Sequence, residues 1–247
     1  MITKERRTMY TMNRQVTYSE VASDLKVNMA GLVHYFQDCT IAHSETVGQG
    51  VSAVAQTHRA WFLSSWQIEV TQYPLFMDQI TIRTWAHNFK GMYGHRNFDL
   101  IDDAGQQIVR ANSIWIFMDL EKMMPTRITA EDAAPYPLEP ALDMTYDPRK
   151  INILEEENRI LSRTWEPITI HPSFLDSNHH VNNGRYVEEA GNYLLLDTPI
   201  KKMRVDYRKA AKLGDIMHPV CYVKNNIQQV IFQDNSNNIY VIVEYQC

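Results

Sequence analysis

The chain has few cysteines for its length. Cys39, Cys221 and Cys247 are the three among 247 residues. Because their number is odd and they are widely spaced, they match neither a disulfide framework nor the C-x-x-C spacing of a metal site. Such sparse cysteine is typical of a reducing compartment, so we expect a cytoplasmic protein.

Long apolar runs and an excess of positive charge are also missing. No apolar run approaches the roughly 20 residues that a membrane-spanning helix requires, and the charged start of the chain lacks the apolar core of a signal peptide. The formal net charge is −5, so we expect no general attraction for nucleic acid. What is present, 45% hydrophobic and 21% charged residues, is typical of a soluble globular protein of one large or two ordinary domains.

A pattern of elements is repeated along the chain. Residues 66–71 alternate apolar and polar side chains, as a half-buried strand does, and residues 203–208 repeat that alternation 137 positions later. The same shift of 137 carries Asp78 onto Asp215 in the turn that follows. A shift of 131 relates two predicted hairpins, at 101–108 and 232–239.

Two helices are predicted in matching places. One begins at Val27-Asn28 and continues to residue 40; the other begins 154 positions later at Val181-Asn182 and continues to residue 194. The Asn near each start is a predicted N-cap, because its side chain can accept from amides of the first turn. The change of shift (154 − 137) gives the first helix and its following loop about 17 extra residues.

Each half therefore predicts a strand, one long helix and several antiparallel strands, an α+β arrangement in which the helix packs on a twisted sheet. We predict an N-terminal unit at 1–130, a linker at 131–160 and a C-terminal unit at 161–247. The linker is rich in proline and acidic residues. It is expected to be ordered against the surface, because a structureless segment of this length is unusual in a compact protein.

The densest group of reactive side chains lies at 174–183, with the sequence FLDSNHHVNN. Asp176, Asn178 and His180 occupy alternate positions, which share one face of an extended chain. We therefore expect the three side chains to converge at the start of the second helix. His180 is the best general base, because imidazole titrates near neutral pH. Asn178 could polarise a carbonyl or position a water.

Asp176 has two interpretations from sequence alone: it orients the imidazole of His180, or it accepts from a backbone amide. Asn182 and Asn183 lie where free amides and the helix dipole favour an oxyanion. The structural alternative is that the acid and the amides only shape a turn and cap the helix.

Two further histidines, His179 and His171, lie near this segment. His179 should point to the opposite face and be structural. A metal site that joins Asp176 and His180 to His171 is disfavoured, because the neighbouring amides are poor ligands for zinc. We expect no metal and no other cofactor.

The D-x-N-x-H-V-N-N string at 176–183 and the order of elements resemble the acyl-[acyl-carrier-protein] thioesterases of plants and bacteria. Further matches are R-A-x-S-x-W-x-x-x-D at 110–119 and V-D-Y-R-K at 205–209, and the resemblance covers nearly the whole chain. It implies two hotdog folds in tandem. It also implies hydrolysis of fatty acyl-acyl-carrier-protein, which releases free fatty acid and ends chain elongation. Plant members carry a transit peptide that is not seen here, so the sequence is more similar to bacterial members.

The sequence departs from the family after residue 208. Members commonly have an acid there, followed in plants by a cysteine, but this chain has Ala210 and Ala211. Cys221, about ten residues later, is expected to be a small buried hydrophobe. The resemblance therefore implies that His180 activates water with help from Asn178 and Asp176, without the extra acid or a cysteine nucleophile.

The first half has no counterpart of the polar triad. The resemblance implies that this half houses the acyl chain, and its aromatic residues could line such a slot, although ordinary core packing is the favoured interpretation of any single one. The candidates are Trp61, Trp66, Phe76, Trp85 and Phe98.

A basic run lies between residues 201 and 212, with Asp206 as its one acid. Its members are Lys201, Lys202, Arg204, Arg208, Lys209 and Lys212. Acyl carrier protein is strongly acidic, so Arg208, Lys209 and Lys212 are candidate docking residues for it. The alternative is an ordinary solvated strand face.

Two other functions fit the same fold. One is a hotdog hydratase or dehydratase acting on acyl thioesters, although the N-x-H-V-N-N string matches thioesterases better. The other is a non-catalytic protein that binds acyl thioesters, which the alanines at 210 and 211 favour. The sequence leaves the oligomeric state open, including a homodimer of the duplicated chain.

Overall fold

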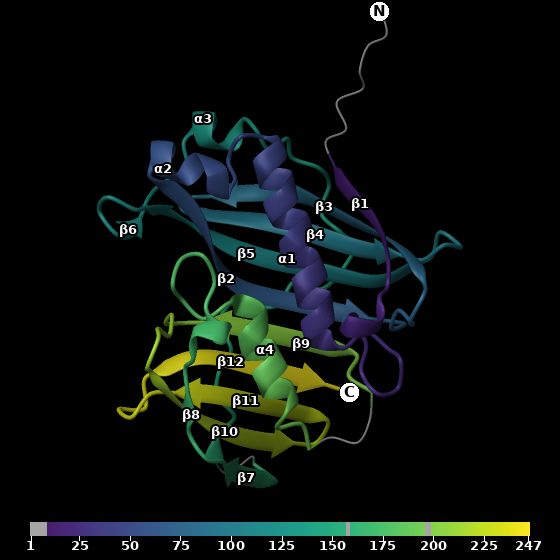
Figure 1. Cartoon of the computed structure of the whole chain (residues 1–247), viewed down its shortest axis with the longest axis vertical. Coiled ribbons are helices and arrows are strands. Elements are labelled where there is room, and N and C mark those ends of the chain that lie inside the picture. Colours follow the sequence, from purple (N-terminus) through teal and green to yellow (C-terminus); the bar gives the residue numbers. More distant parts are fainter. Residues whose placement is uncertain (1–8, 157–158, 196–198) are drawn as a thin grey trace, which may run out of the picture.

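The computed structural model describes residues 9–156, 159–195 and 199–247 (Figure 1). The charged first eight residues, which bear on the signal-peptide expectation, lie outside this range. The first half contains, in chain order, β1 (Tyr10–Gln15), η1 (Tyr18–Glu20), α1 (Met29–Thr46), η2 (Val51–Ala53), α2 (Val54–Thr57), β2 (Arg59–Val70), β3 (Gln79–Lys90), β4 (Tyr93–Ile101), β5 (Gln107–Asp119), β6 (Met124–Pro125) and α3 (Ala130–Ala133). The second half contains β7 (Leu161–Thr164), β8 (Ile168–Thr169), η4 (Pro172–Phe174), α4 (Asn183–Gly191), β9 (Lys202–Tyr207), β10 (Ile216–Lys224), β11 (Ile227–Gln233) and β12 (Ile239–Gln246).

The described strands form one 12-stranded sheet that both halves share. The order along it is β1-β3-β4-β5-β2-β9-β12-β11-β10-β7, with β6 beside β5 and β8 beside β10. The halves meet where β2 pairs antiparallel with β9, from Ser65–Asp206 to Glu69–Lys202. Helices α1 and α4 lie on the same face of this sheet and contact each other (Figure 1). The described part of the chain contains no helix that is both long and apolar enough to cross a membrane.

Both long helices begin where the sequence predicts. The side chain of Asn28 accepts from the amide of Gly31, and that of Asn182 accepts from the amide of Gly184, each at 2.9 Å. The predicted N-caps are therefore confirmed. Helix α1 has 18 residues and α4 has 9, so α4 ends at Gly191, short of the predicted residue 194. The helix thus accounts for 9 (18 − 9) of the roughly 17 extra residues expected in the first half, and the segment after it for the rest.

The duplication extends to individual hydrogen bonds. The amide of Val16 donates to the carbonyl of Asp78, and the amide of Ile170 donates to that of Asp215, each at 2.9 Å. In each half the same aspartate then accepts, through Oδ2, from an amide three residues before it, at 2.8 Å and 2.9 Å respectively. The predicted internal repeat is confirmed at this level.

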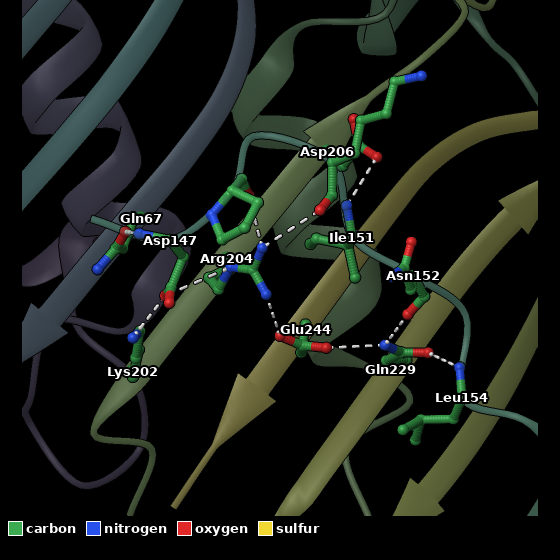
Figure 2. A network of polar contacts seen from close by, with 12 residues as sticks. Gln67, Asp147, Ile151, Asn152, Leu154, Lys202, Arg204, Asp206, Gln229 and Glu244 are labelled. Carbon is green, nitrogen blue, oxygen red and sulfur yellow. Dashed lines mark hydrogen bonds and ion pairs between the residues drawn. The ribbon is translucent and has the colours of Figure 1, made fainter. Parts of the chain in front are cut away.

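The linker packs along the sheet through polar contacts (Figure 2). Asp147 Oδ2 lies 2.6 Å from Lys202 Nζ and 3.5 Å from Arg204 Nε. Further along, the amide of Ile151 donates to Asp206 Oδ2 (3.1 Å). Gln229 then holds the backbone of residues 152 and 154, at 2.9 Å each. Residues 147–154 of the linker are therefore ordered against the sheet, as expected, and part of the basic run serves this purpose.

Candidate active site

The motif segment forms a tight turn rather than an extended strand. An antiparallel bridge between Leu175 and Val181 closes it, and the amide of Asp176 donates to the carbonyl of His180 (2.8 Å). His179 adopts a left-handed conformation with φ of 59°. The expectation that alternate side chains share one face of an extended chain is therefore wrong here, because the turn interrupts the period of two.

One carboxylate oxygen of Asp176 holds this turn. Its Oδ1 accepts from the amide of Asn178 (2.8 Å) and from the amide of His180 (3.4 Å). Aspartate commonly stabilises turns in this way. Among the described residues, no hydrogen bond links the Asp176 carboxylate to the His180 imidazole. Of the two interpretations of Asp176, the structure supplies the contact to backbone amides.

The first half contains the same turn without the reactive side chains. Its closing bridge joins Val21 to Val27, and Leu25 takes the left-handed conformation with φ of 61°. Ala22 and Lys26 occupy the positions of the carboxylate and the imidazole. The shape of the turn therefore comes with the duplication, whereas the combination of Asp176, Asn178 and His180 belongs to the second half.

His180 pairs with the loop that follows β9. Its backbone forms an antiparallel bridge with Lys212, and its side chain is half-buried. Within the described ranges, no residue forms a hydrogen bond with the imidazole nitrogens. His180 and Asn178 thus belong to one hydrogen-bonded turn, and the ring nitrogens have no partner there that would compete with a substrate or a water.

Asn182 and Asn183 begin helix α4. The side chain of Asn182 is used for capping, as the structural alternative proposes, and the carbonyl of Asn183 accepts from the hydroxyl of Tyr207 (2.9 Å). The backbone amide of Asn182 donates to the carbonyl of Phe174 (2.9 Å), so of the two amides only that of Asn183 has no partner among the described residues. Its role in stabilising an oxyanion stays a prediction.

A cavity of about 380 Å³ lies beneath the second part of α1. Its walls come from α1, from η2 and α2 after it, and from β2 to β5, with aromatic surface from Trp61, Phe89 and Trp115. Ser177 and Asn178, from the turn of the second half, also line it. Its size falls within the roughly 300–1,000 Å³ of small-molecule sites. The cavity therefore brings the slot of one half to Asn178 of the other, whereas Asp176 and His180 do not line it.

Of the five aromatic residues predicted to line an acyl slot, Trp61 does so. Trp66 and Phe98 instead contact each other in the core below α1, with ring centroids 4.9 Å apart. Trp85 is buried and donates its indole N–H to a linker carbonyl (2.9 Å), and Phe76 packs edge-on against another ring. For these four the alternative of ordinary packing holds, because aromatic content alone cannot distinguish core from cavity wall.

Arg96 is a cavity residue that the sequence interpretation missed. It lies on β4 in phase with Gly94 and Phe98, on the face that packs toward α1, and it lines the cavity. An arginine in the apolar phase of a strand is the sequence signal that identifies it.

Of the two positions where family members have an acid and a cysteine, Ala210 is exposed and Ala211 is packed in the core. Ala211 is fully buried; its carbonyl accepts from the amide of Val181 (3.0 Å), and its amide donates to the hydroxyl of Tyr186 (2.9 Å). Cys221 is also fully buried, as expected, and burial raises the pKa of its thiol to about 11. Such a thiol is not a thiolate nucleophile at neutral pH.

The three predicted docking residues differ in whether an acidic side chain of the protein already pairs with them. Arg208 donates to Asp206 (2.9 Å), and Lys209 pairs with Asp234 (2.9 Å). Lys212 has no ion-pair partner in the described part of the chain. The basic run is therefore largely neutralised within the molecule, and Lys212 is the candidate best placed to meet an acidic partner.

No group of three or more His, Cys, Asp or Glu side chains that could hold a metal ion occurs in residues 9–156, 159–195 and 199–247. His171, the third member of the disfavoured metal alternative, is exposed.

Curated relatives of the chain are plant proteins. It is 25% identical over 202 residues to a chloroplastic acyl-[acyl-carrier-protein] hydrolase of Cuphea viscosissima, covering 77% of this chain and 47% of that protein. It is 24% identical over 230 residues to a chloroplastic palmitoyl-acyl carrier protein thioesterase of Arabidopsis thaliana, covering 87% and 55%. The chain thus spans about half the length of the curated relatives it matches.

Solved structures share the fold over nearly the whole chain. An acyl-ACP thioesterase from Bacteroides thetaiotaomicron has a TM-score of 0.85 at 21% identity, covering 97% of both chains. The 12:0-ACP thioesterase of Umbellularia californica has a TM-score of 0.80 at 17% identity, covering 97% of this chain and 96% of that one. The prediction of an α+β protein with two tandem hotdog folds is confirmed.

Two family models account for most of the residues. The acyl-ACP thioesterase N-terminal domain matches residues 7–136, and the acyl-ACP thioesterase C-terminal domain matches residues 158–242. The chain therefore belongs to the acyl-ACP thioesterase family.

Proposed function

We propose that the protein hydrolyses the thioester of a fatty acyl chain carried on acyl carrier protein and releases free fatty acid. One observation supports this most directly: the cavity of the first half is lined by Ser177 and Asn178 from the motif turn of the second half. An acyl chain in the slot would have its thioester near that turn. The reaction would end fatty-acid synthesis in the cytoplasm.

The turn supplies the groups that hydrolysis requires. His180 takes a proton from a water as the water oxygen bonds to the thioester carbonyl carbon. The side-chain amide of Asn178 and the backbone amide of Asn183, at the start of α4, stabilise the negative carbonyl oxygen. The C–S bond then breaks, and the imidazolium of His180 returns the proton to the leaving thiolate. Asp176 contributes by holding the turn that carries both side chains.

Thiol release tests the activity. We expect wild type to release free thiol from acyl-acyl-carrier-protein and His180→Ala to lose on the order of 10²–10⁴-fold in kcat, the usual contribution of a general base. His179→Asn is the matched control, because it removes the adjacent imidazole and Asn tolerates the left-handed conformation of that position. Its activity should stay close to wild type.

Other outcomes would identify the competing functions. A wild type that binds acyl thioester but releases no thiol above blank would be a binding protein. A wild type that adds water across an enoyl chain, or removes it, while the thioester stays intact would be a hydratase or dehydratase. Equal losses in His179→Asn and His180→Ala would remove the case for His180 as the base.

We also propose that acyl carrier protein approaches over Lys212, which lies beside His180. Reversing this charge in Lys212→Glu should raise KM for acyl-acyl-carrier-protein and spare small acyl thioesters, since long-range attraction to an acidic carrier would be lost. The control is Lys201→Glu, an equal reversal at the opposite end of β9. Equal effects of the two variants, or equal losses on both kinds of substrate, would rule out docking at Lys212. Lys209→Glu is a weaker test, because it also breaks the pair with Asp234.

A further inference from the structure

Arg96 places a guanidinium in the wall of an otherwise largely apolar slot. The residue is 7% exposed, and it borders the cavity together with apolar neighbours such as Ala86 and Trp115. Arginine is seldom buried to this extent unless it is paired with an acid or hydrogen-bonded throughout. The hydrogen-bond and ion-pair partners of the Arg96 side chain therefore determine how costly its burial is.

Only one of the three guanidinium nitrogens of Arg96 forms hydrogen bonds with other described residues. Its Nη1 lies 2.8 Å from His43 Nδ1 and 3.2 Å from Thr84 Oγ1. Within the described residues, no acceptor receives a hydrogen bond from Nη2 or Nε, and no carboxylate forms an ion pair with the side chain. Asp99, an acid on the same strand, is bonded to Arg83 and to Gln107 instead.

The charge on Arg96 is also not balanced by its neighbours. Burial lowers its pKa to about 10, so the guanidinium is still protonated at neutral pH. Burial and the Arg96 charge lower the pKa of His43 to about 4, so this imidazole is neutral. The ring of Tyr136, 5.3 Å from Arg96 Cζ, gives a cation–π contact that offsets some of the cost of burial.

This arrangement disfavours an unmodified hydrocarbon chain. An alkyl chain packed against Arg96 would exclude water from the free N–H groups without replacing its hydrogen bonds, and a buried charge left in that state is costly. An oxygen atom on the chain would accept from those groups, and hydrogen bonds to charged donors are among the stronger ones.

We propose that the slot is built for an oxygenated acyl chain, with a hydroxyl, keto or carboxylate oxygen that accepts a hydrogen bond from Arg96. The inference rests on the proposed thioesterase function and adds its substrate class. The oxygen could be carried near the thioester or at the far end of the chain, and both positions present the same acceptor.

A set of length-matched substrates tests this proposal. Wild type is assayed for thiol release with an unmodified acyl thioester, with its 3-hydroxy counterpart, and with counterparts that carry a terminal hydroxyl or a terminal carboxylate. We expect kcat/KM to be roughly tenfold to hundredfold higher for at least one oxygenated chain, the range for one hydrogen bond to a charged donor. The position that gives the preference identifies where the oxygen is carried.

Arg96→Met should abolish this preference, mainly by improving the unmodified chain, because the variant keeps the apolar stem and removes the charge. Arg96→Lys should retain part of the preference, since it keeps a cation but not the planar donor array. Lys90→Met is the matched control: it removes an exposed cation from the β3–β4 turn, outside the cavity, and should leave the substrate ratio unchanged.

Three results would overturn the proposal. One is a wild type that prefers the unmodified chain or treats all chains alike. Another is a substrate ratio that Arg96→Met leaves unchanged. The third is a lower Tm with equal losses on every substrate in Arg96→Met, which would make Arg96 purely structural.

Failure of the proposed function is a separate outcome. If wild type hydrolyses none of the thioesters, calorimetric binding of the free fatty acid and of its hydroxylated counterparts still examines the slot. Tighter binding of a hydroxylated acid that is lost in Arg96→Met would support the assignment of Arg96, and equal binding would refute it.

Discussion

The carboxylate of Asp176 accepts hydrogen bonds from two amides of its own turn, so we expect its acceptor oxygen to matter more than its charge. We expect Asp176→Asn to keep most of the activity, because a carboxamide oxygen can accept the same two bonds. Asp176→Ala should lower kcat at least tenfold and lower Tm, since two amides lose their acceptor and the turn that carries Asn178 and His180 loosens. Steady-state kinetics and thermal unfolding of the two variants make the comparison. If both variants lose activity equally while both stay folded, the negative charge is what matters.

At the scale of single residues, sequence predicts capping and fails on side-chain direction. Asn28 and Asn182 could be identified because an N-cap depends on the local sequence alone. The predicted convergence of Asp176, Asn178 and His180 assumes an extended segment, whereas the structure has a tight turn there. The equivalent segment of the first half forms the same turn, with Leu25 in the left-handed conformation. The turn is therefore a feature of the repeat and not of the reactive side chains.

Helix α1 differs from α4 in the part that builds the cavity. The shorter helix matches only the first half of α1, and the additional residues from 38 to 57 supply eight residues of the cavity wall. These residues are Thr40, Ile41, Ser44, Gln49, Gly50, Val51, Val54 and Ala55. The sequence predicted this extra length correctly from the change of shift. It could not show that the added segment encloses a cavity, which depends on how the segment folds back over β2 to β5.

Contact between the two helices depends on a glycine. A methyl group at Gly184 would overlap the imidazole of His34 on α1, so the ring would have to move. We expect Gly184→Ala to destabilise the protein by about 1–3 kcal/mol, the usual cost of overpacking. Gly191→Ala is the control in the same helix, because a methyl group there meets open space and alanine favours helix. Chemical denaturation of both variants decides the matter; equal free energies of unfolding would show that the helices are not tightly apposed at Gly184.

For the molecule as a whole, the linker is held by side chains of the second half. Gln229 donates to the carbonyl of Asn152 (2.9 Å) and accepts from the amide of Leu154 (2.9 Å), as Figure 2 shows. We expect Gln229→Ala to speed proteolytic cleavage around residues 152–154 and to lower stability by about 1–3 kcal/mol, because the two hydrogen bonds that hold the backbone of Asn152 and Leu154 are lost. Gln233→Ala, at the exposed end of the same strand, should change neither. Cleavage at the wild-type rate in Gln229→Ala would show that other contacts hold the linker.

Sequence reasoning predicts the duplication and the fold well because both depend on periodic patterns that repeat along the chain. It interprets the basic run less well, because a count of charges does not reveal pairing. Lys202 and Arg204 are committed to Asp147 of the linker, a contact between residues more than fifty positions apart. The proposed boundaries at 1–130, 131–160 and 161–247 stay a prediction.

The pairing of β2 with β9 has a consequence for how the chain unfolds. Strand β2 has hydrogen-bonded neighbours on both sides, β5 from its own half and β9 from the other, so unfolding of either half removes a hydrogen-bonded neighbour from a strand of the other half. Amides along residues 65–70 should therefore be among the slowest to exchange with deuterium. The two ancestral copies would then melt in one cooperative transition, so that a mutation in either half lowers the thermal resistance of both.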